Sequence, residues 1–585
     1  MLECVILPAT LKAICNSAFE GTVGLTKIDI PASVSHIGSR AFYGSGLEQL
    51  TFAQGSSLQS IASSAFENTL SLQSVALPAG VKDIQRFAFY KSGLREVVFA
   101  KDSVLTAVGD YAFSGTNLAE VSIPDSVLKI GYHCFENDVQ LEKVDFPENG
   151  SIMLCGYAFY RTGLKDITLP KSVTYVGEFC FSDCEQLTAI TAVEENGSYT
   201  SADGVLFNKS QTKLVTFPAG KTGSYTVPGQ TQHLAFGAFE GAKLQNVAFP
   251  SDSELMTIGY RAFYNAAGLE RVRLPACVQS VDFYAFANCT NLSEVVVPND
   301  SCMSGIYQGA FYHCAGLREI SIPDTVREIG DNAFDGCESL SVVKIAETSG
   351  LIAIGDQAFA HTNISAFAFP AGLLDVGQEA FSYTALDTFA LPASVEYVGP
   401  GVLKGTTPTK LTLSFLGYAP GDYETATLVY TFDRPGADPS VLPDTLKSVH
   451  VLNCPILYAS AFEGADTLEC VTLETPTVIA GRAFSHCKAL REVHTGGKVT
   501  YVGIYAFYGC ENLTTVDFLD SMQTADNFAF YECKSLRIAA MPSLTTVGGE
   551  TFFYCSFSGD LDLSSVRKLG GEGFRYCLLY TSDAA

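Results

Sequence analysis

The chain lacks several features that would place it in common protein classes. Nowhere do about 20 apolar residues follow one another, so no segment is predicted to insert into a membrane. Basic residues are scarce: 36 Lys and Arg stand against 62 Asp and Glu, and the net charge of −26 would repel nucleic-acid phosphates. Tryptophan is absent, but hydrophobic residues make up 47% of the 585, too many for a disordered chain. The composition therefore predicts a folded acidic protein with no nucleic-acid partner.

Motifs of catalysis and metal binding are also missing. The chain contains no C-x-x-C, H-E-x-x-H, G-x-S-x-G or G-x-G-x-x-G pattern, and its eight His are scattered. Gly220-Lys221-Thr222 matches the end of a phosphate-binding loop, but Val215 stands where that loop needs its first glycine. The carboxylates form no paired motif. We therefore predict no enzymatic activity, no cofactor and no metal site.

A repeat with a period of about 23 residues fills the chain instead. In it, Ala-Phe is followed three residues after the Phe by a small residue. We call this Phe the anchor, and the series is Phe19, Phe42, Phe66, Phe89, Phe113, Phe135, Phe159, Phe181, Phe239, Phe263, Phe286, Phe311, Phe334, Phe359, Phe381, Leu403 (in place of Phe), Phe462, Phe484, Phe507, Phe530, Phe552 and Phe574. Such periodicity predicts a stack of similar coils.

One repeat, residues 25–44, shows the physical logic. Apolar and polar residues alternate up to Ile30, as in a half-buried strand, and Pro31 ends the strand because it has no N–H to donate. Gly38 occupies a slot, four residues before the anchor, that is glycine in more than half of the repeats. Either a positive φ or close approach of the next coil explains this glycine. Ala41 and Phe42 then predict a single helical or 3₁₀ turn.

The predicted fold class is therefore a β-rich repeat solenoid. It would be a right-handed stack of about two dozen coils, each with a short parallel strand and a short helical or 3₁₀ turn. No coil can bury its own apolar stripe, since about six buried side chains at roughly 1.5–3 kcal/mol each compete with the ordering of about 23 residues at roughly 1–2 kcal/mol each. Stacking many coils supplies the missing burial.

Half of the 18 cysteines are explained by their small size. Nine of them lie three residues after an anchor, where other repeats carry Ser, Thr or Ala: Cys184, Cys289, Cys314, Cys337, Cys487, Cys510, Cys533, Cys555 and Cys577. These residues share small volume rather than redox chemistry, so the slot is predicted to be tight and buried, with Cys as a small hydrophobe. Oxidation of neighbouring cysteines in the stack is the alternative.

Spacing divides the chain into segments. Long and short repeats alternate through the first 360 residues, which indicates a duplicated two-coil unit of about 47 residues. Two gaps in the anchor series mark insertions. The predicted segments are solenoid repeats in 1–190, a hairpin-like insertion in 191–222, central repeats in 223–403, an irregular loop in 404–445, and repeats again in 446–577. Residues 2–8 begin in mid-repeat and residues 578–585 lose the register, so we expect the chain to be part of a longer protein with a non-native tail.

The repeat resembles that of BspA-type leucine-rich repeat proteins. The pattern LxxIxIPxSVxxIGxxAFxxCxxL is carried well by residues 317–340, and the resemblance extends over residues 2–577. It implies a secreted or surface-displayed protein that adheres to proteins or glycans of host or neighbouring cells, or to matrix. Leu403, Thr551 and Gly573 depart from the pattern without changing the class.

Two outward-facing sets of residues are candidates for binding. Tyrosine often follows the anchor, and a row of such rings suits protein or glycan contact, although it could simply shield the coil edge. The tyrosines are Tyr43, Tyr90, Tyr160, Tyr264, Tyr312, Tyr508 and Tyr531. Outward strand positions carry Glu96, Glu120, Lys143, Asp145 and Asp166, for which plain solvation is the alternative.

Binding over an extended face is thus the predicted function. A structural stalk that presents another domain is the alternative. A glycan-degrading enzyme would need a pair of carboxylates in a cleft, which no motif identifies.

Overall fold

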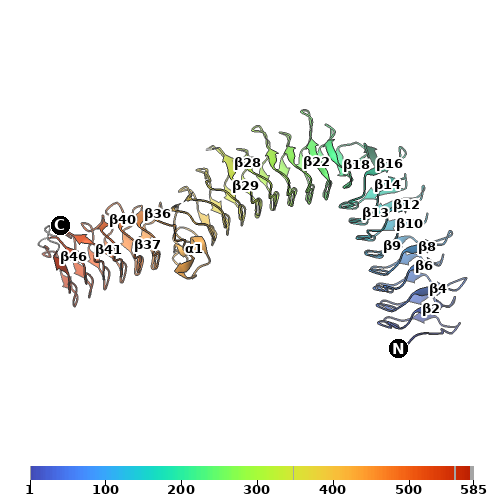
Figure 1. Ribbon diagram of the computed structural model, residues 1–585, viewed down its shortest axis with the longest axis horizontal. Helices are drawn as coiled ribbons and strands as arrows, with labels where there is room; N and C mark the ends of the chain where they lie inside the picture. The colour runs from blue at the N-terminus through green and yellow to red at the C-terminus, as the bar shows by residue number, and fades with distance from the viewer. Residues whose placement is uncertain (1, 347, 559–560, 580–585) are drawn as a thin grey trace. The chain divides into compact units, whose positions relative to one another are not determined.

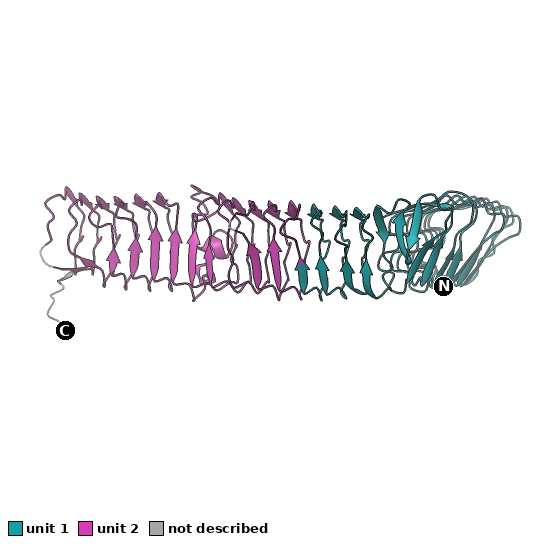
Figure 2. Cartoon of the chain, turned by 90° about the horizontal axis from the view of Figure 1, so that it is seen from above, with its two compact units in different colours: residues 1–295 teal, residues 296–585 magenta. Residues whose placement is uncertain are grey.

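The computed structural model describes residues 2–346, 348–558 and 561–579. The chain divides into two compact units, residues 1–295 and 296–585 (Figure 2). In each unit the coils follow one another in a row, and successive coils pair through short parallel strands (Figure 1).

Each regular coil has two strands and one tight turn. The first, the A-strand, ends near the proline of the repeat. The second, the B-strand, is usually two residues long and precedes the anchor. The segment around the anchor, here called the anchor turn, closes the coil. The sequence predicted only one strand per coil. The B-strand was missed because two residues are too few to show an alternating pattern.

In unit 1 the strands pair from coil to coil within each set. The A-strands are β2 (Lys27–Ile30), β4 (Gln49–Phe52), β6 (Ser74–Leu77), β8 (Glu96–Phe99), β10 (Glu120–Ser122), β12 (Lys143–Asp145), β14 (Asp166–Leu169), β16 (Ala189–Ala192), β20 (Gly223–Thr226), β22 (Leu244–Ala248) and β24 (Arg271–Arg273). The B-strands are β1 (Ala13–Ile14), β3 (His36–Ile37), β5 (Ser60–Ile61), β7 (Asp83–Ile84), β9 (Ala107–Val108), β11 (Lys129–Ile130), β13 (Ile152–Leu154), β15 (Val173–Val176), β21 (His233–Leu234), β23 (Thr257–Ile258) and β25 (Ser280–Val281).

Unit 2 repeats the arrangement, and β26 (Glu294–Val296) contains the division between the units. Its A-strands are β28 (Glu319–Ile322), β30 (Val342–Ile345), β33 (Thr388–Ala390), β35 (Lys410–Leu413), β36 (Ser448–Val451), β38 (Cys470–Leu473), β40 (Glu492–His494), β42 (Thr515–Val516), β44 (Arg537–Ile538), β46 (Ser556–Phe557) and β48 (Leu578–Leu579). Its B-strands are β27 (Gly305–Ile306), β29 (Glu328–Ile329), β31 (Ala353–Ile354), β32 (Asp375–Val376), β34 (Tyr397–Val398), β37 (Ile456–Leu457), β39 (Val478–Ile479), β41 (Tyr501–Val502), β43 (Thr524–Ala525), β45 (Thr546–Val547) and β47 (Lys568–Leu569).

The A-strands of the first coils pair in twos, β2 with β4, β6 with β8 and β10 with β12. The B-strands β1 to β15 form one continuous sheet over the same coils. The polar insertions of the longer repeats, such as residues 54–56, follow every second A-strand. The two-coil period of the sequence is therefore visible in how the A-strands group.

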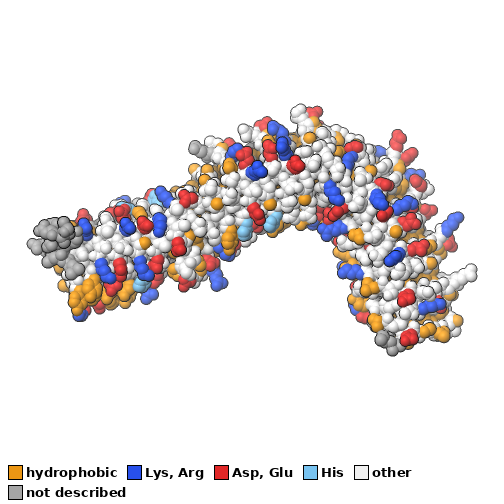
Figure 3. Space-filling view, viewed as in Figure 1, with side chains coloured by type: hydrophobic (Ala, Val, Ile, Leu, Met, Phe, Trp, Pro, Cys, Tyr) orange, Lys and Arg blue, Asp and Glu red, His pale blue; other side chains and the backbone are white. Residues whose placement is uncertain are grey.

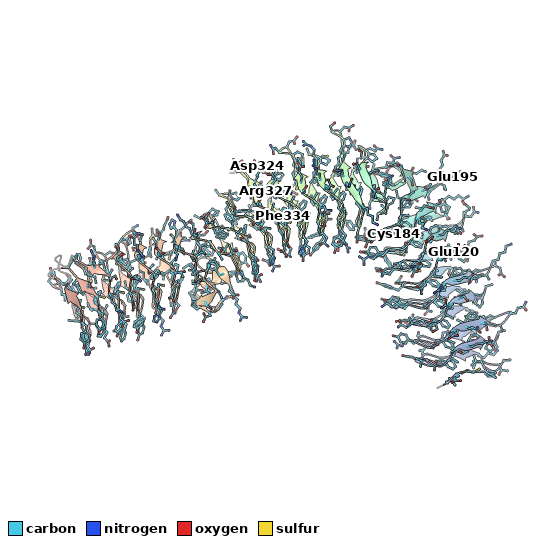
Figure 4. All side chains as sticks on the ribbon, viewed as in Figure 1. Glu120, Cys184, Glu195, Asp324, Arg327 and Phe334 are labelled. Carbon is cyan, nitrogen blue, oxygen red and sulfur yellow. The ribbon has the colours of Figure 1, made fainter. Side chains whose placement is uncertain are left out.

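Stacked anchors form the core. Successive anchor rings lie nearly parallel, with centroids 5.2 Å apart for Phe42 and Phe66 and 5.3 Å apart for Phe311 and Phe334. Both Phe42 and Phe334 are completely buried. The inward residues of the A-strands, such as Ile28, are also buried and complete the core. Figure 4 shows Phe334 within the stack and Asp324 at its edge. Each buried Phe contributes roughly 1.5–3 kcal/mol.

The anchor turn is not helical, contrary to the prediction. Residues two before and two after every anchor have positive φ, for example Arg40 (58°) and Gly44 (60°). Alternate N–H groups bond within the turn and to the next coil: Tyr43 N–H donates to Arg40 O at 3.1 Å, whereas Phe42 N–H donates to Ala65 O at 2.8 Å. The left-handed residues turn every second amide toward the neighbouring coil, so inter-coil hydrogen bonds replace a helical turn.

The glycine slot before the anchor reflects close approach rather than positive φ. Gly38 has no positive φ, and a Cβ there would lie 2.5 Å from Asn16 Oδ1 and 2.6 Å from Asn16 N of the preceding coil. Gly377 meets Asp356 in the same way. Of the two explanations that the sequence left open, the structure supports the second.

Both insertions contribute to the stack. In residues 191–222, β17 (Tyr199–Ala202) pairs antiparallel with β18 (Val205–Asn208), which pairs antiparallel with β19 (Lys213–Thr216). β19 then takes a B-strand position by pairing parallel with β21. Phe217, which follows it, stacks on the anchor Phe239 at 4.9 Å.

The sequence predicted an irregular loop over residues 404–445, and this prediction is wrong for part of the segment. It contains the A-strand β35, the helix α1 (Val429–Phe432) and the 3₁₀ helix η1 (Pro439–Val441). All four residues of α1 are buried, and Leu403 N–H donates to Thr431 O at 2.9 Å. Hydrophobic residues of the segment, including Tyr430 and Phe432, fill the position of an anchor turn.

The expected loss of register after Cys577 needs one correction. Leu578 and Leu579 pair with Ser556 and Phe557 as β48 and β46, so the repeat continues to Leu579. The rest of the predicted tail lies outside the described residues.

Candidate binding surfaces

The anchor turns carry two columns of aromatic side chains on their outer side. One column is the residue after the anchor, which the sequence identified through its tyrosines. The other is the residue two before the anchor, which the sequence analysis missed. We call the two columns together the anchor-turn face.

In unit 1 the missed column is a continuous stack. Phe87, Tyr111, His133, Tyr157 and Phe179 follow one another with ring centroids 4.5–4.9 Å apart. The first four are partly exposed. An aromatic residue in the same slot of five consecutive repeats was the signal that could have revealed them.

In unit 2 rings of the anchor-turn face stack along the C-terminal coils. Tyr508 and Tyr531 stack at 4.9 Å, and Tyr531 stacks on Phe553 at 4.7 Å. Beside them Tyr554 and Tyr576, 39% and 53% exposed, stack at 5.3 Å. Figure 3 shows hydrophobic side chains gathered along one edge of unit 2 near this end, whereas charged side chains of both signs are mixed over the rest of the face in view.

The other predicted tyrosines have individual partners. The Arg40 guanidinium lies 4.0 Å from the Tyr43 ring centroid, and that of Arg261 lies 3.9 Å from Tyr264. Tyr90 meets Phe87 edge to face at 5.2 Å, and Tyr312 meets its neighbour His313 at 4.2 Å. Such contacts hold the rings in place while leaving them partly accessible.

Tyr160 does not belong to an accessible row. It is 7% exposed, and its hydroxyl donates to Glu240 Oε1 at 3.1 Å. The sequence placed it with the other tyrosines because it has the same repeat position. The 191–222 insertion places Glu240 against Tyr160, and no local sequence pattern predicts this contact.

Glu240 is the centre of a buried polar cluster. Its side chain is fully buried, and Arg261 Nη2 donates to its Oε1 at 2.5 Å. Burial raises the pKa of Glu240 to about 7, against the opposing effect of the Arg261 guanidinium. The main chain joins the same coils, since Asp183 N–H donates to Glu240 O at 3.3 Å. The cluster therefore fastens the coils on either side of the 191–222 insertion.

The predicted charged residues lie on the outer face of the A-strands. Glu120 pairs with Lys143 and Ser122 with Asp145 in the β10–β12 register, and Lys143 Nζ lies 2.6 Å from Asp145 Oδ2. Glu96 and Asp166 are exposed on β8 and β14. The structure thus brings three of the five together, as an exposed ion-pair cluster of small energetic weight.

The same face of unit 2 contains a hollow of ≈ 600 Å³. It lies over the ends of β28 and β30 and reaches Ala368, in a stretch where no A-strand follows β30 directly. Asp324 is on its rim, and Asp324 O accepts from Gly350 N at 3.0 Å. The hollow is a second possible contact surface.

The cysteine slot is tight and buried. The Cys510 thiol donates to Phe484 O of the preceding coil at 3.0 Å, and Cys533 donates to Phe507 O at 3.2 Å. Thr69 in the same slot donates to its own anchor carbonyl at 2.7 Å. Burial raises the pKa of the Cys184 thiol to about 11, so this thiol is protonated and unreactive at neutral pH.

Three side chains on the A-strand face could hold a metal ion, although the sequence predicted none. The donor atoms of Cys470, Glu492 and His494 all lie within 4.8 Å of one another. The search for C-x-x-C missed them because they come from two coils. Strand register, rather than sequence spacing, brings them together.

Comparison with known proteins identifies the family. The chain matches the family described as BspA type leucine rich repeat region over residues 1–106, 106–227, 216–305, 304–416 and 456–580. It therefore belongs to the BspA-type leucine-rich repeat family, as its repeats predicted. No curated protein sequence matches the chain.

The chain is also similar to several solved structures. A leucine-rich repeat protein from Eubacterium ventriosum is 22% identical, with 58% of this chain and 83% of that one covered and a TM-score of 0.48. A leucine rich cell surface protein from Faecalibacterium prausnitzii is 24% identical, covering 64% and 86%, with a TM-score of 0.43. The pneumococcal vaccine antigen PcpA is also 24% identical, covering 57% and 84%, with a TM-score of 0.41. Across the described part of the chain, no helix has both the length and the apolar character needed to cross a bilayer.

Proposed function

We propose that this protein is a non-enzymatic binding module, secreted or displayed on a cell surface, that adheres to proteins of host cells, matrix or neighbouring cells. The observation that carries the proposal is the anchor-turn face, with its stacked and partly exposed aromatic rings. Surface-displayed relatives, such as the leucine rich cell surface protein of Faecalibacterium prausnitzii, support the location.

Stacked aromatics suit recognition for an energetic reason. Tyrosine offers a large contact area with few rotatable bonds, and here its neighbours already hold it, so binding orders little. Tyr508 is held by stacking on Tyr531 and by edge-to-face contact with Tyr505 at 5.5 Å. Repetition of the motif along each unit allows several weak contacts to act together.

The experiment is a comparison of three forms of the full chain. Replacing Tyr508, Tyr531 and Tyr554 together with alanine is expected to weaken binding to cultured host cells or immobilised matrix proteins about tenfold or more, since buried interface tyrosines are typical hot spots. The control replaces Tyr132 and Tyr175, which are 52% and 47% exposed elsewhere. Circular dichroism checks that all forms are folded.

The possible outcomes separate the alternatives. Unchanged binding by the folded triple variant would exclude the part of the anchor-turn face around Tyr508 and Tyr531 as the contact surface. If the unaltered chain binds none of these targets, the stalk function becomes the better explanation.

A further inference from the structure

The outer face of β38 and β40 brings together three side chains of different chemistry. In the parallel register Cys470 lies opposite Glu492, and Thr472 lies opposite His494. Val471 and Val493, between these positions, are buried in the core. Alternation along a strand therefore places Cys470, Glu492 and His494 on the same, outward side.

The donor atoms are close enough to share one ion. All three lie within 4.8 Å of one another, and His494 Nε2 is 3.2 Å from Glu492 Oε2. Around a tetrahedral zinc ion, with bonds of roughly 2.0–2.3 Å, donor atoms lie about 3.3–3.8 Å apart. Small rotations of the Cys470 and Glu492 side chains would reach that spacing, because neither side chain is fully buried.

The donor set selects the metal. A thiolate and an imidazole favour zinc and other late first-row ions, whereas calcium and magnesium require oxygen ligands. The site lies on a sheet, whose paired backbones fix the spacing of the two strands before any ion arrives. Three protein ligands leave one tetrahedral position open.

Neighbouring groups have a mixed charge. His450, one strand away on β36, has its Nε2 3.1 Å from Oε1 of Glu474, the residue that directly follows β38. Lys410 lies two strands away in the same row as Cys470. Burial and the Glu492 carboxylate raise the pKa of the Cys470 thiol, against the opposing effect of Lys410.

We propose that Cys470, Glu492 and His494 form a zinc-binding site on the A-strand face of unit 2, with the fourth position open to water. On binding, the Cys470 thiol loses its proton to solvent and its sulfur bonds to the ion. The site is independent of the anchor-turn face, so its test does not depend on the proposed adhesion.

The test measures zinc binding and the protection of one cysteine. The full chain, dialysed against a chelator and titrated with zinc chloride, is expected to bind zinc with micromolar or tighter affinity. Cys470→Ser and His494→Ala should each weaken that affinity tenfold or more. Cys302→Ser and His361→Ala are the matched controls, because both residues are exposed in the same unit but lie outside the cluster.

Alkylation with iodoacetamide followed by mass spectrometry supplies the second readout. Zinc should slow modification of Cys470 and leave that of Cys302 unchanged. With cobalt in place of zinc, a thiolate-to-metal absorption band should appear and be absent from Cys470→Ser. If zinc affinity is the same in Cys470→Ser and the unaltered chain, or if zinc does not protect Cys470, the proposal is wrong.

Discussion

At the scale of the residue, the anchor turn shows how stacking dictates torsion angles. Side chains as large as Tyr111 (φ 56°) and Phe179 (φ 60°) adopt the left-handed conformation, which costs about 1–2 kcal/mol per residue relative to the right-handed one. Tyr111 gains a backbone hydrogen bond to the next coil in return, since its N–H donates to Tyr132 O at 2.9 Å. The array compensates locally unfavourable geometry with contacts that exist only between coils.

The glycine slot supplies the first prediction. Gly377→Ala is expected to lower the free energy of unfolding by about 1–3 kcal/mol, the usual cost of overpacking, because its Cβ would lie 2.5 Å from Asp356 N. Gly372→Ala is the control, since nothing lies within 4 Å of a Cβ there and its φ is not positive. Denaturant unfolding of both variants measures the difference. Equal stability of the two would show that close approach does not explain the slot.

At the scale of the element, the insertions show how a regular stack tolerates irregular sequence. β19 with Phe217, and α1 with its four buried residues, each fill the place of a regular element. The cluster of Glu240, Arg261 and Tyr160 then joins coils that are distant in sequence. A buried hydrogen-bonded network of this kind contributes only while every neighbouring coil is in place.

Glu240 gives a pH prediction. Its pKa in the folded state is about 7, above the ordinary value of 4.5, so between pH 4.5 and 7 the folded chain binds more protons than the unfolded one. The contribution of Glu240 to stability should therefore fall as pH rises through this range, by roughly 3 kcal/mol at 1.36 kcal/mol per pH unit. Glu240→Gln cannot titrate. The stability of the unaltered chain relative to this variant should fall accordingly, as followed by denaturant unfolding at several pH values. A flat or rising difference would mean that Arg261 keeps Glu240 ionised in the fold.

At the scale of the whole molecule, stability comes from nearest-neighbour contacts between coils. Regular coils repeat the same buried anchor and the same two strand positions, so each is stabilised mainly by the coils directly beside it. The net charge of −26 favours solubility of an array with so much hydrophobic sequence. Adding or removing whole coils should therefore change the length of the protein without changing its fold.

Deletion of residues 43–89 tests this property. It removes one two-coil unit and joins Phe42 to Tyr90, which restores the local sequence Ala-Phe-Tyr at the junction. The shortened chain is expected to fold, with the β-rich circular dichroism of the full chain and a Tm lower by a few degrees at most. Deletion of residues 31–42 is the control, because it removes β3 and an anchor but keeps the preceding A-strand. If the whole-unit deletion unfolds as much of the chain as this control does, the coils are not interchangeable.

Much of the fold was predictable because the same pattern of apolar and small residues recurs in every repeat. The inward columns, the small slot filled by Cys510 or Thr69 and the family all followed from residue spacing. The two-residue B-strands did not, since they have no pattern of their own. Of the aromatic columns on the proposed binding surface, the sequence pointed to the one with Tyr508 and Tyr531 but not to the one with Tyr111 and Tyr157.

The amino-acid sequence alone determined that the protein is a stack of coils. Apolar residues repeated at a fixed period can be buried only against the equivalent residues of neighbouring coils. Tertiary structure decided which outward side chains meet. Tyr160 reaches Glu240 across 80 residues, and Cys470 lies opposite Glu492. Such pairs depend on how one coil registers on the next, and register is set by the hydrogen bonds between coils rather than by the residues that those bonds bring together.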